Sequence, residues 1–339
     1  IQSDPASIKP GFSIMSQNNL STLVSSLGYE YSENKHKMHS MVKWMGWYFI
    51  LESRLDYGQN AEIQKMESAV EPVMISKGIS LRNTLSLPLI FSGSSFSQYL
   101  YMSVSSDYRN NYIYVRETDK YDTGQNMLTG RFFLSNYYRS SIRDIHPRWA
   151  QILEISHSAY PFDRNIYGTI TTFRSVFYFP GILKNNGIKI KLDAENQNPE
   201  KFILGNRASF SRSYDNIISE KLRFASIDYF MPLVYPDIHI GSLLYLPKLR
   251  ADFFYDYTSS TGTYFLNRVN LGNSFDYHDY REAFKSFGVE LMSDFYLLRI
   301  PFMISAGIQS AWRQLNEAPY LKLLLNIDIY GMNIGKKAF

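Results

Sequence analysis

Histidine is the residue type in this chain best suited to binding a metal or acting as a general base, and six histidines are present. They are scattered along the sequence, at His36, His39, His146, His157, His239 and His278. His36 and His39 are three residues apart, which on a strand places them on opposite faces, so we expect no shared metal. Cysteine is absent, which excludes disulfides, thiolate ligands and a cysteine nucleophile.

Two short fragments combine histidine with an acid or a hydroxyl, as a catalytic site in a membrane protein would. They are "HDY" at 278–280 and "ISHSAY" at 155–160. In the second fragment, alternation places His157 on an apolar side, whereas Ser156 and Ser158 point the other way. Phosphate-binding glycine loops, acidic calcium loops and paired-carboxylate motifs are also missing. We therefore predict that the protein is not an enzyme and needs no cofactor.

Arg212 suggests binding rather than catalysis. It lies in "ASFSRSYDNI" at 208–217, among small hydroxyls and aromatics, without a catalytic base or a cluster of basic residues nearby. A guanidinium pairs well with a carboxylate through two parallel hydrogen bonds where water is largely excluded. The residue is therefore either a solvated loop arginine or one half of such a pair.

The elements that must position these side chains are strands, because polar and apolar residues alternate nearly everywhere. In "GIKIKLDAEN" the apolar Ile188 and Ile190 alternate with Lys189 and Lys191. The same period occurs in "FILESRLDYG", "LRADFFYDY" and the C-terminal "YLKLLLNIDI", whose apolar positions are Leu321, Leu323, Leu325, Ile327 and Ile329. Each strand thus has one apolar and one charged side.

Short turns and long polar segments alternate between these strands. We expect tight turns at "SQNNLS", "MGWYF", "FSGSSF", "SSIRDIHPRW", "FPGILKNNG", "PLVYPDIH" and "YLLRIP". Long loops are expected around 60–74, 109–126, 196–219 and 258–283. Short turns at one end and long loops at the other are typical of outer-membrane barrels. About fifteen strands fit within residues 1–339, and even strand numbers in bacterial barrels predict one more strand before residue 1.

These patterns predict an all-β fold, a transmembrane antiparallel β-barrel of about sixteen strands, with residues 1–339 as one barrel domain and an N-terminal periplasmic part outside the chain. A soluble β-sandwich is the alternative, but the repeated full charges on one face suit a wet lumen better. The net charge is only +4 and is not clustered, so no nucleic-acid partner is expected.

The order of segments around Arg212 resembles that of a known family. "FSRSYD" is followed by five further strands, which begin with "LRFASIDYFMPLVYP" and "LLYLPKLRADFFYDYTSS". This order is similar to the C-terminal barrel of the BamA/TamA-like outer-membrane surface-antigen superfamily. It also resembles barrels of Bacteroidota-type outer membranes that follow a periplasmic propeller.

The resemblance implies a long outer loop that folds into the lumen with an Arg-Gly-aromatic motif, here Arg212, Ser213 and Tyr214. It further implies that Asp256, in a Phe-x-Asp-x-Gly pattern on the inner wall, pairs with this arginine. Ser213 and residue 258, a threonine, stand where the family has glycine. Arg207 is the alternative partner of Asp256.

The family resemblance implies a non-enzymatic subunit of an outer-membrane protein assembly or translocation complex. The alternatives are a structural barrel that anchors a periplasmic or surface domain, and a channel for small solutes. Expected partners are the lipid bilayer, with lipopolysaccharide among its lipids, and other outer-membrane or periplasmic proteins. The closing strand from Leu321 to Ile329 is expected to face lipid and to serve sorting and closure.

Overall fold

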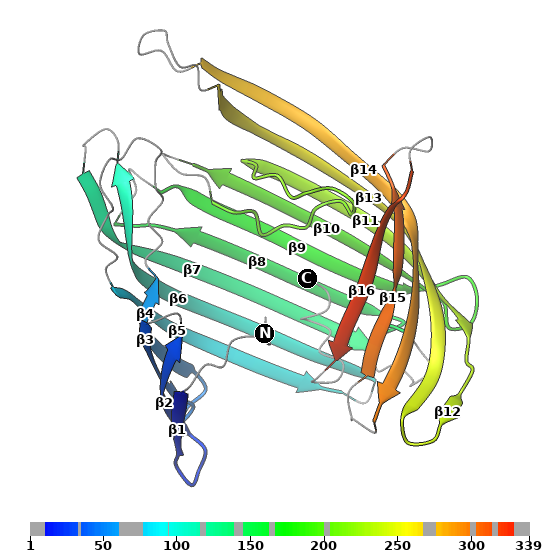
Figure 1. The fold of residues 1–339 in the computed structure, drawn as a ribbon, viewed down its shortest axis with the longest axis horizontal. Coiled ribbons are helices and arrows are strands. Elements are labelled where there is room, and N and C mark those ends of the chain that lie inside the picture. Colours follow the sequence, from blue (N-terminus) through cyan, green and yellow to red (C-terminus); the bar gives the residue numbers. More distant parts are fainter. Residues whose placement is uncertain are drawn as a thin grey trace. The chain divides into compact units, whose positions relative to one another are not determined.

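The structure is a computed structural model. It describes residues 11–32, 35–60, 77–93, 95–115, 120–138, 145–162, 167–199, 204–266, 276–298, 303–313 and 318–328. All regular elements described are strands (Figure 1). They are β1 (Gly11–Gln17), β2 (Leu23–Ser32), β3 (Lys35–Trp44), β4 (Ile50–Asn60), β5 (Lys77–Ser92), β6 (Phe96–Val115), β7 (Lys120–Tyr138), β8 (Ala150–Ala159), β9 (Thr169–Pro180), β10 (Gly187–Asn198), β11 (Lys221–Val234), β12 (Ile238–Ile240), β13 (Leu244–Leu266), β14 (Asp276–Leu297), β15 (Met303–Trp312) and β16 (Tyr320–Asp328).

The strands form one sheet of 16 strands in which chain neighbours are sheet neighbours from β1 to β16. Only β12 leaves this path, because it pairs with β13 alone while β11 pairs directly with β13. Each strand pairing whose register is described is antiparallel, as between β1 and β2 and between β15 and β16. The prediction of an all-β antiparallel fold of about sixteen strands is confirmed. A strand before residue 1 stays a prediction.

The chain contacts divide the molecule into two compact units. The first unit comprises Ile1–Leu89, Tyr101–Phe132 and His157–Thr169. The second comprises Ile90–Leu100, Phe133–Ser156 and Ile170–Phe339. Within the described ranges, no helix has the length and hydrophobicity needed to cross a membrane.

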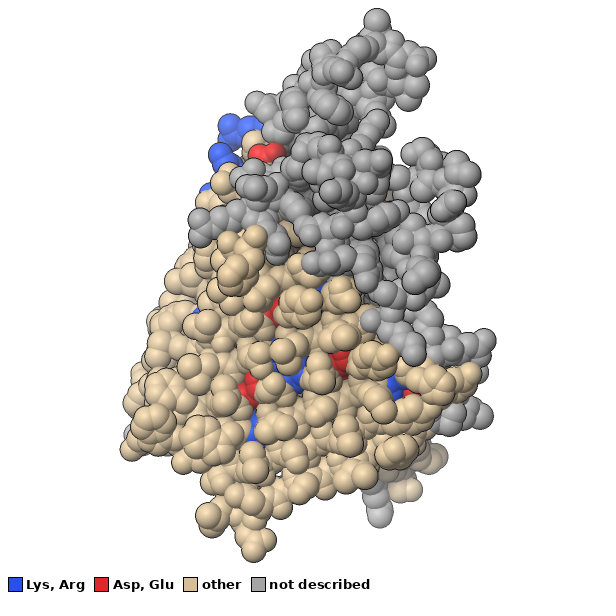
Figure 2. All heavy atoms as spheres, turned by 90° about the vertical axis from the view of Figure 1, so that its left-hand side faces the viewer, with Lys and Arg blue, Asp and Glu red and all other residues tan. Residues whose placement is uncertain are grey.

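The first unit has strands with two unlike faces. In β4, Leu51 and Leu55 are exposed, while Asp56 on the alternate side is buried. Neighbouring strands continue the apolar face, because Leu51 lies opposite Leu85 and Leu55 opposite Leu81. Figure 2 views the molecule from the side where Figure 1 labels β1 to β5, and charged side chains are sparse on the described part of that face. Such an exposed apolar face needs a cover other than water.

The strands of the second unit also have two unlike faces. On one face its strands expose apolar side chains, and on the other they bury polar ones. The exposed set includes Leu192, Ile227, Phe253, Tyr255, Leu291 and Ile308. The buried set includes Asp193, Glu195, Ser226, Asp228, Asp252, Asp256, Thr258, Ser286 and Gln309. We call the side with the buried set the polar face. Unlike a soluble core, where most buried groups are apolar, it buries many polar and charged side chains beside apolar ones such as Leu222 and Phe224.

The predicted short turns are confirmed where the structure describes them, since each falls between strands that follow one another in the chain. Parts of "FSGSSF", "SSIRDIHPRW" and "YLLRIP" lie outside the described residues. "PLVYPDIH" contains more structure than expected: it ends in β12, which forms a small hairpin with the start of β13. The long loop predicted around 196–219 is present between β10 and β11. The region expected around 60–74 lies mostly outside the described residues.

Two predicted loops are wrong over most of their length. Much of 109–126 belongs to β6 and β7, and much of 258–283 belongs to β13 and β14. The β13 and β14 pairing continues to Leu266 and Asp276, beyond Thr261, where the described β11 pairing ends. Both segments are rich in polar residues, so their composition favours a loop over a strand. Ladder hydrogen bonds join backbone groups and form nonetheless.

Candidate functional site: the seat of the loop between β10 and β11

The loop between β10 and β11, described from residue 204, lies over the polar face of the second unit. It forms no helix or strand, so its backbone N–H groups need other acceptors. Glu195 Oε2 accepts hydrogen bonds from the N–H groups of Arg207 at 2.9 Å and Ala208 at 3.1 Å. Asp193 Oδ2 accepts the N–H of Ser209 at 2.8 Å. Two carboxylates of β10 thus fix the first half of the loop through its backbone.

The base of the loop is closed by amide side chains. Gln197 exchanges two hydrogen bonds with the backbone of Leu204, at 2.9 and 3.0 Å. Its amide also donates to Asn206 Oδ1 at 2.9 Å, and Asn206 in turn donates to the carbonyl of Ile217 at 2.9 Å. These contacts join the two ends of the loop, so it leaves and re-enters the sheet at one place.

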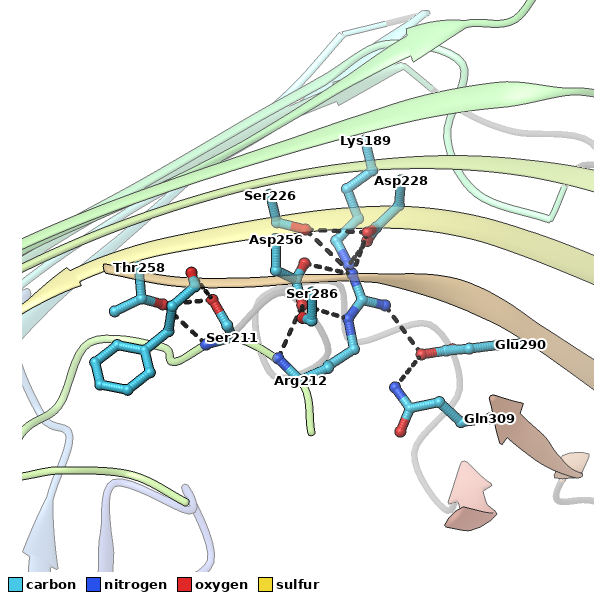
Figure 3. Close-up of polar contacts among 11 residues, drawn as sticks. Lys189, Ser211, Arg212, Ser226, Asp228, Asp256, Thr258, Ser286, Glu290 and Gln309 are labelled. Atoms are coloured by element: carbon cyan, nitrogen blue, oxygen red, sulfur yellow. Dashed lines mark hydrogen bonds and ion pairs between the residues drawn. The ribbon is translucent and has the colours of Figure 1, made fainter. Parts of the chain in front are cut away.

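We call the part of the polar face that binds this loop the seat. Arg212 lies at its centre (Figure 3). Its Nε and Nη2 donate to the two oxygens of Asp256 at 2.8 and 2.9 Å, and its backbone N–H donates to Asp256 Oδ2 at 2.9 Å. Nη1 donates to Glu290 Oε1 at 2.9 Å, and Nη2 also contacts Asp228. Asp256 is fully buried, so these contacts with Arg212 lie out of water.

An aromatic ring stacks on the same guanidinium. The Cζ atom of Arg212 is 3.6 Å from the centre of the Phe254 ring, which is a cation–π distance. The ring has room because Gly288 stands opposite it on β14, where an added Cβ would be 2.7 Å from the Phe254 Cζ. Burial disfavours the charge on Arg212, but hydrogen bonding to Asp256 and the charges of Asp228, Asp256 and Glu290 outweigh burial and raise the pKa of Arg212 above its usual value.

Further polar groups hold these carboxylates in place. Lys189 Nζ is 3.0 Å from Asp228 Oδ2. Gln309 donates to Glu290 Oε1 at 3.0 Å (Figure 3). Side chains of β11, β13 and β14 therefore contact Arg212 directly, and side chains of β10 and β15 contact two of its carboxylate partners.

Ser213 has the backbone conformation that glycine favours. Its φ is 74°, in the left-handed region that costs most residues about 1–2 kcal/mol. Its buried hydroxyl has no hydrogen-bond partner among the described residues. Glycine would therefore adopt this backbone conformation with less strain than the serine does.

Thr258, the second departure from the family pattern, anchors the loop. Its Oγ1 accepts the N–H of Ser211 at 2.9 Å and lies 2.7 Å from the Ser211 hydroxyl. The Ser211 hydroxyl also donates to the carbonyl of Phe284 at 3.2 Å. Both hydroxyl residues are buried, so the contact fixes the residue just before Arg212.

Tyr214 packs on the outer side of the seat. Its ring lies 5.2 Å from that of Phe284, and the guanidinium of Arg313 stacks on it at 4.5 Å. Arg313 also donates to the carbonyl of Ser213. Tyr214 thus continues the seat toward β15, with its hydroxyl donating to the carbonyl of Lys285 at 3.1 Å.

The structure thus places Arg212 against Asp256, whereas Arg207, the alternative partner, contributes its backbone N–H to Glu195. Sequence reasoning did not name Asp193, Glu195, Asp228 or Glu290 as site residues. Alternation places Asp193 and Glu195 on the charged face of their strand, but only strand register shows which of many polar residues meet the loop.

The apolar positions of the closing strand lie on the exposed face. Leu321, Leu323 and Leu325 are 66%, 82% and 71% exposed. Ile327 belongs to β16, but its side chain is not described, and Ile329 lies outside the described residues. In β8, the histidine of "ISHSAY" is exposed while Ser156 and Ser158 are buried, as the alternation predicts.

Comparison with known proteins finds similarity in structure alone. No family model matches the chain, and no curated protein matches its sequence significantly. Among solved structures, it is similar to BamA from Haemophilus ducreyi lacking POTRA domains 1–3, with a TM-score of 0.50 and 13% identity. The match covers 94% of this chain and 67% of that chain. This similarity shows that the chain has a BamA-like barrel fold.

Proposed function

We propose that this chain is an integral β-barrel of a bacterial outer membrane that serves protein assembly or translocation as a subunit of a larger complex. The observation that carries the proposal is the seat of Arg212 on Asp256, in a chain with a BamA-like fold. The family resemblance implies this pairing from the sequence. We assign the seat a role in positioning the loop and propose no catalytic step.

The apolar faces support a location in a membrane. Exposed leucines and aromatics cover one side of the strands in each unit, whereas the other side carries buried carboxylates and hydroxyls. Outer-membrane barrels show this arrangement, with lipid against the apolar band. The lipid bilayer is therefore the first proposed partner, and lipopolysaccharide is a further candidate at the outer leaflet.

The seated loop favours a role in assembly over a role as an open channel. A diffusion pore needs free space along its polar wall, but here the loop lies on the polar face of the second unit and is bound by side chains of β10, β11, β13 and β14. A loop held by one network of charges can instead couple its position to the strands around it. A scaffold barrel that only anchors another domain is the second candidate.

Depletion of the protein in its native bacterium tests the proposal. If the chain serves assembly, the levels of many unrelated outer-membrane barrels should fall together while their transcripts do not. Loss of only a few proteins that co-purify with the chain would indicate a scaffold. Complementation with Arg212→Ala should restore less activity than complementation with Arg174→Ala, a change in an ion pair away from the seat. The chain itself should fractionate with outer-membrane markers.

A further inference from the structure

The first unit holds a second cluster of charged residues, on strands β4, β5 and β6. Arg54 donates to both oxygens of Asp56, at 2.9 and 3.2 Å. Arg82 and Arg109 share Asp107, which they contact at 2.5 Å and 3.3 Å. We call Arg54, Arg82 and Arg109 the arginine cluster. Three guanidinium groups face two carboxylates, so the cluster has an excess of one positive charge.

The register of the strands brings like charges together in this cluster. Arg54 on β4 lies directly opposite Arg82 on β5. Directly opposed residues have Cβ atoms about 4.5–5.5 Å apart, and like charges at such positions destabilise a sheet. Asp56 pairs with Arg54 alone. Within the described part of the chain, no acidic residue bridges Arg54 and Arg82.

Each arginine also keeps part of its hydrogen-bonding capacity. Arg54, Arg82 and Arg109 use Nε and Nη2 on the aspartates, and the Nη1 group of each makes no hydrogen bond within the described ranges. Their side chains are 52%, 52% and 51% exposed, whereas Asp56 and Asp107 are buried. The aspartates thus bind the Nε and Nη2 edge of each guanidinium and leave its Nη1 group free for a ligand.

We propose that the arginine cluster binds a small, water-soluble oxyanion, with phosphate as the first candidate. Guanidinium groups recognise phosphate through paired N–H donors, and an anion between Arg54 and Arg82 would remove their repulsion. The anion is not a lipid headgroup, because the cluster lies opposite the apolar face. Leu55, next to Arg54, and Tyr108, between Asp107 and Arg109, are exposed on that other face.

Binding of inorganic phosphate to the full chain in dodecyl maltoside, a detergent without phosphate or charge, tests this inference. The ³¹P linewidth of phosphate should broaden saturably with the wild-type protein. Arg54→Gln and Arg82→Gln should each weaken the apparent affinity at least about five-fold. Arg174→Gln, which removes a guanidinium bound to Glu154 at 2.6 Å, is the matched control and should bind as the wild type does.

Folding of each variant is checked by its heat-modifiable migration in gels. Arg82→Lys keeps the positive charge but loses the paired N–H donors of the guanidinium. This variant should fold, and it should bind phosphate more weakly than the wild type does. Absence of broadening in the wild type, unchanged affinity in both glutamine variants, or equal displacement by chloride at constant ionic strength would overturn the proposal. Displacement of phosphate by phosphatidylglycerol in vesicles would assign the cluster to a lipid headgroup instead, and would equally overturn it.

Discussion

Arg212 brings one positive charge into contact with three carboxylates, Asp228, Asp256 and Glu290. Lys189 adds a second positive charge at Asp228. The free-energy cost of removing water from such charged groups offsets much of their Coulomb attraction. The network therefore specifies the position of the loop more than it stabilises the fold. The arrangement also predicts that the consequence of a substitution depends on which charges it leaves unpaired.

Arg212→Ala should release the loop. It leaves Asp256 fully buried without its cation, and a lone buried charge costs on the order of 3–5 kcal/mol. Hydrogen exchange of the amides of Arg207, Ala208 and Ser209 should therefore become faster, because these groups are protected only while the loop is seated. Arg174→Ala should leave the exchange of these amides unchanged.

The double variant Arg212→Ala with Asp256→Ala should be less damaging than either change alone, yet worse than the wild type. Asp228 keeps Lys189 as its partner, but Glu290 loses its arginine. Hydrogen exchange of the loop amides in the two single variants and the double variant measures the coupling between Arg212 and Asp256. Additive effects would mean that the two groups do not act as a pair.

Ser213→Gly should stabilise the protein. The serine has φ of 74°, and its hydroxyl is buried without a hydrogen-bond partner in the described structure, so glycine relieves strain and loses no contact. We expect the free energy of unfolding to rise by about 0.5–1 kcal/mol. The change removes the penalty of a left-handed backbone, but part of this gain is lost because glycine has more conformational freedom in the unfolded chain. Urea unfolding in lipid vesicles measures it. Ser211→Gly, which removes a hydroxyl bonded to Thr258, is the control and should destabilise.

At the scale of elements, strand faces could be predicted from sequence, but strand lengths could not. Alternation along β10 and β13 follows because one face of these strands is exposed and apolar while the other is buried and polar. Where β13 and β14 extend past their neighbours, the sequence is rich in Asn, Asp, Ser, Thr and Gly, and this composition resembles that of a loop. The pairing of Arg212 with Asp256 is likewise expected from the family resemblance and not from alternation. Asp228 and Glu290 depend on register, which the pattern does not specify.

The closing strand β16 is expected to require apolar residues at its exposed positions. Replacing Leu323 and Leu325 by Lys should cost about 2–4 kcal/mol each if they lie near the middle of the bilayer. The yield of folded, heat-modifiable protein in membranes should fall accordingly. Leu324→Lys, on the alternate side of the strand, should be tolerated better. Normal yield of the double leucine variant would show that this face does not meet lipid.

At the scale of the whole molecule, the two units follow one rule: many large apolar residues are exposed, and many buried residues are polar or charged. The hydrophobic effect cannot stabilise such a chain in water, because folding leaves large apolar faces exposed. In a bilayer those faces are covered, and the backbone groups of the strands are satisfied by neighbouring strands. The sequence alone predicts this inversion, because full charges recur at every second position of strands that are apolar on the other side.

Site-directed spin labelling can test the inversion directly, because the chain contains no cysteine and any single cysteine can be labelled alone. In lipid vesicles, labels at Ile190, Ile227 and Tyr255 should collide with oxygen, which dissolves in the bilayer. Labels at Lys191 and Asp252, on the alternate sides of the same strands, should have less contact with oxygen and more with a water-soluble nickel complex. A period of two in these accessibilities along β10, β11 and β13 is expected because successive side chains point to opposite faces. Equal access of the nickel complex to both sides would mean that the apolar face is wet, and would remove the membrane location on which the proposed function depends.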